Sequence, residues 1–140
     1  MDFMRSGAKH LSLSQHVEQC LFMVARTRLV YPIIGWLFAY MSFALPVDRL
    51  YESQDWVAFY HPSPSYPFHV LLVPKRAIPK LTGMTAADAS LLTELVQITQ
   101  LLVIRFNLED KGYRLIANGG TYQDIPQLHF HLVSGESMKE

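Results

Sequence analysis

Residues 127–133 read QLHFHLV and decide how the fold is interpreted, because polar and apolar side chains alternate along them. Alternate side chains of a β-strand share one face. The pattern therefore predicts a strand at 128–133 whose apolar residues enter the core, while Gln127, His129 and His131 point the other way. Three polar groups on an inner strand cost stability unless they face a cleft, so they indicate a site. The other interpretation is a half-exposed strand whose polar face meets water.

Outward from this strand, the chain from Pro46 onward carries further strand signals. Short segments rich in β-branched and aromatic residues predict strands at 47–51, 56–60, 68–73 and 113–117. A Gly-rich turn and a Pro-rich loop separate some of them. Together with one helix signal, these segments favour a single α+β domain.

The helix signal covers residues 85–106. Thr85 suits an N-cap, and Asp88 follows three residues later, as in a capping box. Apolar residues then recur at spacings of three and four, which places them on one stripe of a helix. The stripe consists of Leu91, Leu95, Ile98, Leu102 and Phe106. This pattern predicts one long helix that packs on the sheet.

Composition excludes several classes of protein. The chain has 140 residues, of which 50% are hydrophobic and 17% charged, so it can bury a core of one domain. Twelve basic residues balance twelve acidic ones, and a neutral chain lacks the basic footprint of a nucleic-acid-binding domain. The one cysteine, Cys20, excludes an internal disulfide and a cysteine-based zinc site.

Residues 1–44 are expected to form a helical, hydrophobic N-terminal extension. The stretch from Leu29 to Leu45 carries no charge, but it is slightly shorter than the roughly 20 apolar residues that span a bilayer. Three interpretations stay open. The stretch is a buried or dimer-forming helix, or a segment at the membrane surface that involves residues 21–45, or a membrane span.

Four features in order resemble the histidine-triad (HIT) family of nucleotide hydrolases and transferases. They are YESQDWVAFYHPSPSYPFHVLLVPK (51–75), one long helix, GYRLIANGG (112–120) and QDIPQLHFHLVSG (123–135). The resemblance covers Leu45 to Gly135 and implies a domain at 45–140. It implies an antiparallel sheet of about five strands with one long helix, a homodimer, a nucleotide or nucleoside phosphate ligand, and no cofactor. We expect a cytoplasmic protein, with membrane association left open.

The resemblance also implies roles for individual residues. The family pattern His-φ-His-φ-His-φ-φ, where φ is hydrophobic, places its nucleophile at His129 and its third histidine at His131. A neutral imidazole can attack the α-phosphorus, which gives a covalent intermediate. The family's upstream histidine matches His69, which with His131 would donate hydrogen bonds to phosphoryl oxygens. The family's asparagine and glutamine match Asn118 and Gln123.

Three positions depart from the family pattern. Gln127 stands in place of the first triad histidine, and glutamine is no proton donor at neutral pH. His61 stands where the family has an acidic residue that binds the ribose. Asp124 stands where many members have a serine or threonine, and a carboxylate beside a phosphate repels it.

These departures leave two functions open. The leading prediction is hydrolysis or nucleotidyl transfer at the α-phosphate through His129. The alternative is a non-catalytic nucleotide-binding or interaction module. The same histidines have a third interpretation, in which His129 and His131 bind a metal ion together with His69 or His61. We predict no metal, because the family pattern explains these residues without one.

Overall fold

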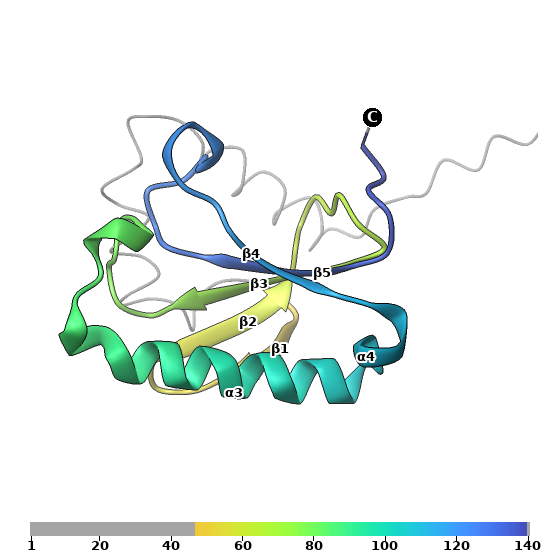
Figure 1. The fold of residues 1–140 in the computed structure, drawn as a ribbon, viewed down its shortest axis with the longest axis horizontal. Coiled ribbons are helices and arrows are strands. Elements are labelled where there is room, and N and C mark those ends of the chain that lie inside the picture. Colours follow the sequence, from red (N-terminus) through yellow and green to blue (C-terminus); the bar gives the residue numbers. More distant parts are fainter. Residues whose placement is uncertain (1–46, 140) are drawn as a thin grey trace, which may run out of the picture.

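A five-stranded antiparallel sheet forms the centre of the protein. The structure, a computed structural model, describes residues 47–139 (Figure 1). The strands are β1 (Arg49–Glu52), β2 (Trp56–Tyr60), β3 (Phe68–Pro74), β4 (Arg114–Ala117) and β5 (Phe130–Ser134). Their spatial order is β1-β2-β3-β5-β4, with every neighbouring pair antiparallel. The last strand of the chain therefore lies inside the sheet, between β3 and β4.

One long helix, α3 (Ala89–Arg105), crosses a single face of this sheet (Figure 1). The Thr85 hydroxyl accepts a hydrogen bond from the backbone N–H of Ala87, and the Asp88 carboxylate accepts one from the backbone N–H of Thr85. This capping box closes a short 3₁₀ turn, η3 (Ala86–Asp88), directly before the helix. An ion pair between Arg76 and Asp88, 2.8 Å long, ties the start of the helix to the segment after β3.

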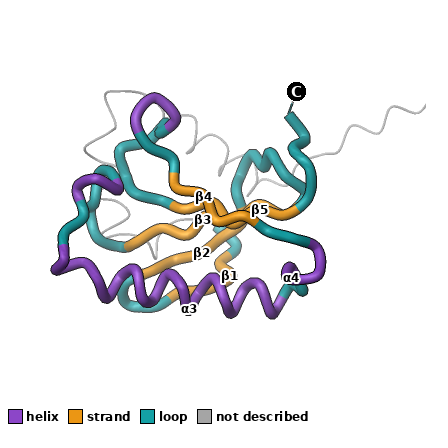
Figure 2. Tube along the Cα trace, viewed as in Figure 1, coloured by secondary structure: helices purple, strands orange, loops and turns teal. Residues whose placement is uncertain are grey.

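Short helical turns occupy several connections. They are η2 (Leu81–Gly83), α4 (Leu108–Lys111) and η4 (Gly120–Tyr122). Figure 2 shows the loops around η4 on the side of the sheet away from α3. Gly112 ends α4 at a φ of +79°, which side chains with a Cβ rarely adopt, so it separates α4 from β4.

The main core lies between the sheet and α3. Leu91, Leu95, Ile98 and Leu102 of the predicted stripe are buried there, and Phe106 is partly buried against them. The same cluster takes in the apolar residues that alternate along β5 and just before it. A second cluster holds Val57, Phe59, Leu71 and Val73, the alternate residues of β2 and β3. The sheet therefore has two distinct faces, and its second face carries the candidate site.

The predicted α+β architecture, with five antiparallel strands and one long helix, is confirmed. Boundaries differ: β1 begins at Arg49 instead of residue 47, and β5 begins at Phe130 instead of residue 128. The predictions for the extension at 1–44, and for membrane contact through residues 21–45, fall outside the described residues.

Within residues 47–139, one helical stretch is long and apolar enough to cross a membrane by length and composition alone. It is Ala86–Arg105, which includes α3. Its apolar stripe is buried against the sheet, as expected for a core helix.

Candidate functional site

Four imidazole rings form a row on the second face of the sheet. Their order is His129, His131, His69 and His61, with 4.9, 5.2 and 4.2 Å between successive ring centroids. The rings of His61 and His69 are stacked, with 26° between their planes. The row brings together four predicted site residues from two separate segments of the sequence, 51–75 and 123–135.

Strand register explains this row. His69 on β3 lies opposite Val133 on β5, and His131 lies opposite Leu71, so the two histidines are diagonal neighbours on one face. The backbone N–H of His61 donates to the carbonyl of His69 at 2.9 Å, which extends the β2–β3 pairing by one residue. That bond places the His61 ring beside the His69 ring.

The loop HPSPS, residues 61–65, sets the protonation of two rings. The backbone N–H of Ser63 donates to Nδ1 of His61, and that of Ser65 donates to Nδ1 of His69, each at 3.0 Å. An Nδ1 that accepts a hydrogen bond has no proton, so in the neutral ring the proton is on Nε2. Both His61 and His69 therefore carry their proton on Nε2.

This assignment extends to His131. The Nε2–H of His69 donates to Nδ1 of His131 at 2.9 Å, which leaves the proton of neutral His131 on Nε2. The Asn118 side-chain amide lies 3.3 Å from that Nε2. Its oxygen is the atom that can accept from an Nε2–H, which fixes the amide orientation. In the series Ser65, His69, His131 and Asn118, each residue therefore donates a hydrogen bond to the next one.

His129 has the opposite tautomer. Its Nδ1 lies 2.7 Å from the backbone carbonyl oxygen of Gln127, which can only accept, so Nδ1 carries the proton. Nε2 of His129 therefore has the free lone pair that a nucleophile needs. In this row Nε2 of His129 has a lone pair, whereas Nε2 of each of the other three rings carries a proton.

Burial keeps these rings neutral. It lowers the pKa of His61 to about 3, with further lowering by His69 and His131. Burial also lowers the pKa of His131 to about 3 and that of His69 to about 4. The pKa of His129 is lowered by burial as well, partly offset by the hydrogen bond to Gln127 and by the charge of Asp124.

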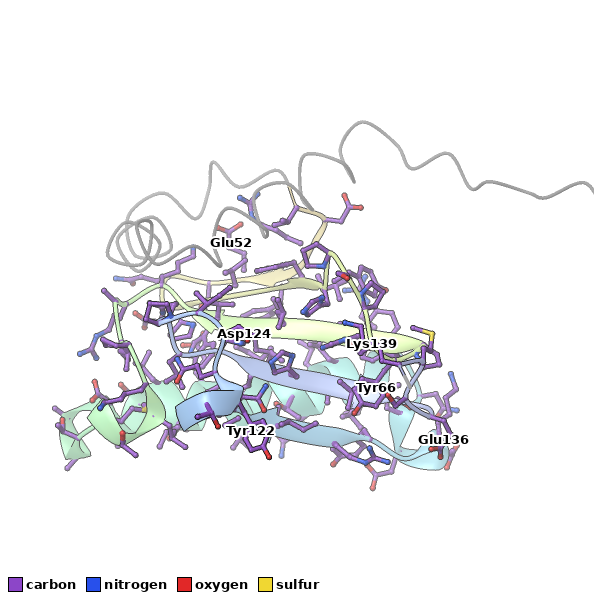
Figure 3. All side chains as sticks on the ribbon, turned by 90° about the horizontal axis from the view of Figure 1, so that it is seen from above. Glu52, Tyr66, Tyr122, Asp124, Glu136 and Lys139 are labelled. Carbon is purple, nitrogen blue, oxygen red and sulfur yellow. The ribbon has the colours of Figure 1, made fainter. Side chains whose placement is uncertain are left out.

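A pocket of about 380 Å³ opens beside three of the four rings. Its lining residues are His61, Ser63, Ser65, Tyr66, His69, Ile116, Asn118, Asp124, His131, Ser137 and Lys139. Figure 3 looks onto this face and shows Asp124 and Lys139 on opposite sides of the pocket. The chain after β5 forms part of the wall because the backbone N–H of Met138 donates to the carbonyl of Ser65 at 2.8 Å.

The same rings are close enough to suggest a metal ion. Ligand atoms of His61, His69 and His131 all lie within 4.8 Å of one another. A metal at Nε2 needs a lone pair there, yet the backbone donors at Nδ1 of His61 and His69 direct the proton to Nε2. The arrangement therefore suits an anion that accepts hydrogen bonds better than a cation.

Three predicted site residues do not line the pocket: His129, which lies at the end of the histidine row, and Gln127 and Gln123, which bond to main-chain carbonyls. Gln127 is 1% exposed, and its amide donates to the backbone carbonyls of Pro74 and Arg76. It does not line the pocket, because its amide is held by these two carbonyls. The Gln123 amide donates to the carbonyls of Pro79 and Ile125, at 2.6 and 2.8 Å.

Sequence reasoning missed the serines of the HPSPS loop and the wall that Ser137 and Lys139 provide. The alternation of proline with serine was the available signal for the loop, because proline has no N–H and each serine keeps one. No pattern in the sequence indicated the contribution of Lys139.

Comparison with known proteins identifies the class. The model of the HIT domain matches residues 43–138. An uncharacterized HIT-like protein of Chlamydia muridarum is 36% identical over 94 residues, which are 66% of this chain and 74% of the relative. An uncharacterized HIT-like protein of Synechococcus elongatus is 33% identical over 96 residues, 67% of this chain and 83% of the relative.

Solved structures agree with the sequence relatives. A HIT family hydrolase from Legionella pneumophila matches with a TM-score of 0.67 and 26% identity, over 74% of this chain and 94% of that one. A HIT family hydrolase from Clostridium thermocellum matches with a TM-score of 0.66 and 27% identity, over 77% and 93%. The fold is thus that of HIT hydrolases. The chain belongs to the HIT domain family, as the resemblance implied.

Proposed function

We propose that this protein binds a nucleotide and catalyses hydrolysis or nucleotidyl transfer at its α-phosphate, with His129 as the nucleophile. The observation that carries the proposal is the pair of hydrogen bonds that assigns opposite tautomers to two rings. The Gln127 carbonyl at Nδ1 of His129 leaves a lone pair on its Nε2, and His69 at Nδ1 of His131 leaves the proton on the Nε2 of that ring. The ring centroids of these two residues are 4.9 Å apart. The two neighbours with 26–27% identity that are named HIT family hydrolases support the same activity.

The reaction would have two steps. Nε2 of His129 attacks the α-phosphorus and forms an N–P bond, while the leaving group departs with its bonding pair and takes up a proton from solvent. Water then attacks the same phosphorus and breaks the N–P bond, which releases the nucleoside monophosphate and restores neutral His129. An alcohol or phosphate in place of water gives transfer.

The surrounding residues would stabilise charge as it develops. The carbonyl of Gln127 accepts from Nδ1–H of His129 and stabilises the positive ring of the intermediate. The Nε2–H of His131, which lies beside Asn118, would turn to a phosphoryl oxygen, while the Nε2–H of His69 holds the His131 ring in place. His61, Lys139 and Asp124 also line the pocket, where they would contact the rest of the ligand.

The test of this function is turnover of adenosine 5′-phosphoramidate and of a dinucleoside polyphosphate, with product followed by chromatography. A crystal soaked with AMP is read for density between His69, His129 and His131. We expect turnover and a phosphate at that position. AMP binding without turnover of either compound would favour the non-catalytic module instead.

We further propose a cytoplasmic homodimer that uses the outer side of α3. Apolar side chains are exposed there, with Ile104 80% and Val96 53% accessible. Ile104→Glu would bury a charge in such an interface, so we expect light scattering to give the dimer mass for wild type and the monomer mass for Ile104→Glu. Tyr122→Glu, at a residue 82% exposed on η4, is the control and should keep the dimer. A wild-type monomer would contradict this proposal.

A further inference from the structure

Gln127 links two segments that lie far apart in the sequence. Its side-chain Nε2 donates to the carbonyl of Pro74 at 3.2 Å and to that of Arg76 at 2.9 Å. The next residue, Leu128, donates its backbone N–H to the carbonyl of Ile78. Residues 127 and 128 are therefore attached to the last residue of β3 and the segment after it by three hydrogen bonds.

The same residue holds the nucleophile candidate through its main chain. The carbonyl oxygen of Gln127 is the acceptor for Nδ1–H of His129, at 2.7 Å. This bond decides which ring nitrogen of His129 keeps the lone pair. Its direction depends on the backbone at 127, which precedes β5 and so is not fixed by sheet pairing.

The Gln127 side chain also carries an energetic cost. Oε1 of Gln127 is buried with no hydrogen-bond partner among the described residues. A buried polar atom of this kind typically costs about 1–3 kcal/mol. An apolar side chain of the same size would avoid that cost, yet it would release the carbonyls of Pro74 and Arg76.

We propose that Gln127 is a positioning residue: its side chain anchors residue 127 to the Pro74–Arg76 segment, so that its carbonyl holds His129 in the Nδ1–H tautomer. This inference rests on the proposed role of His129 as nucleophile. It differs from a role of Gln127 in the pocket, because the side chain bonds to the carbonyls of Pro74 and Arg76 and does not line the pocket.

The variant that tests it is Gln127→Met, which keeps the length of the side chain and removes the donor. Ring ¹⁵N chemical shifts of His129 report the tautomer directly. We expect one protonated Nδ1 and one unprotonated Nε2 in wild type. In Gln127→Met the two shifts should approach each other as the Nε2–H tautomer gains population. We expect kcat to fall about 10-fold or more while KM stays within about 2-fold, because binding groups are untouched.

Thr99→Val is the matched control. Thr99 is buried on α3, where its hydroxyl donates to the carbonyl of Leu95 at 2.8 Å, so this variant also loses a buried side-chain to backbone bond. It should lower the melting temperature and leave the His129 shifts and kcat unchanged. If Gln127→Met behaves like Thr99→Val in both measurements, Gln127 has a structural role only, and the proposal is wrong.

Two further variants keep the proposal testable if Gln127→Met does not fold. Gln127→Asn shortens the side chain by one bond and should show a smaller change in the His129 shifts and a smaller decrease in kcat. Shifts and a kcat equal to those of wild type would contradict the proposal. Gln127→His keeps one donor for one carbonyl and should not exceed the wild-type rate. A faster Gln127→His enzyme would mean that residue 127 acts as an acid in the pocket.

The tautomer measurement does not depend on turnover. If His129→Ala retained full activity, the proposed function would fail, while the ¹⁵N shifts would still show whether Gln127 orients the His129 ring.

Discussion

His129→Ala is expected to lower turnover by about 10⁴-fold or more, because no neighbouring side chain can replace the attacking Nε2. Nε2 of His131 and Nε2 of His69 each carry a proton, so neither has a lone pair for attack. Affinity for AMP should fall only modestly, since the donors remain. With substrate labelled at the α-phosphate, acid-labile label should appear on wild type and be absent from His129→Ala.

His131→Ala is the comparison for this experiment. It removes a donor instead of the nucleophile, so we expect a loss of about 10²–10³-fold with the covalent label still formed. Equal labelling of wild type and His129→Ala would exclude His129 as the nucleophile.

Lowering the pH is expected to destabilise the protein already at pH values well above those at which carboxylates titrate. The pKa values of His61, His69 and His131 are lowered to about 3, 4 and 3 in the fold, against about 6.5 in the unfolded chain. The unfolded state then binds more protons than the native state below pH 6.5. Stability is therefore fully present above that pH and is lost as the pH falls toward 3.

The expected size is a melting temperature at least about 5 °C lower at pH 5 than at pH 7.5. Lys139 opposes protonation of His61 and His69, whereas Asp124 favours protonation of His129 only. The pKa of Asp88 is lowered by its hydrogen bond from Thr85, so this carboxylate stays ionised at pH 5.

His61→Asn removes one of the titrating rings and should reduce the difference between the two melting temperatures. A melting temperature that is the same at pH 7.5 and pH 5 would contradict the burial of neutral imidazoles.

Much of the fold could be predicted because side-chain periodicity reports it directly. The stripe on α3 and the alternation of Leu128, Phe130 and Leu132 both mark the buried side, and all of these except Phe106 are nearly inaccessible. The capping box at Thr85 was equally local, since it needs only two residues three apart. Local signals of this kind can be recognised in a single sequence.

The candidate site was less accessible to the same reasoning. Motif order selected His69, Asn118 and His131, which the structure brings together. Gln127 was misplaced because alternation was extended to a residue three positions before β5, whose amide bonds to main-chain carbonyls instead. Hydrogen bonds to main-chain carbonyls, such as those that hold Gln123, depend on tertiary distances that no local pattern encodes.

The HPSPS loop has a consequence for how this site can change over generations. The donors that set the tautomers of His61 and His69 are main-chain groups, so the side chains at 63 and 65 are not what the rings require. Any residue except proline preserves the donor. Residues 63 and 65 can therefore be substituted widely without changing the tautomers of the two rings. In a library that randomises both positions, the inactive variants should be chiefly those with proline at one of them.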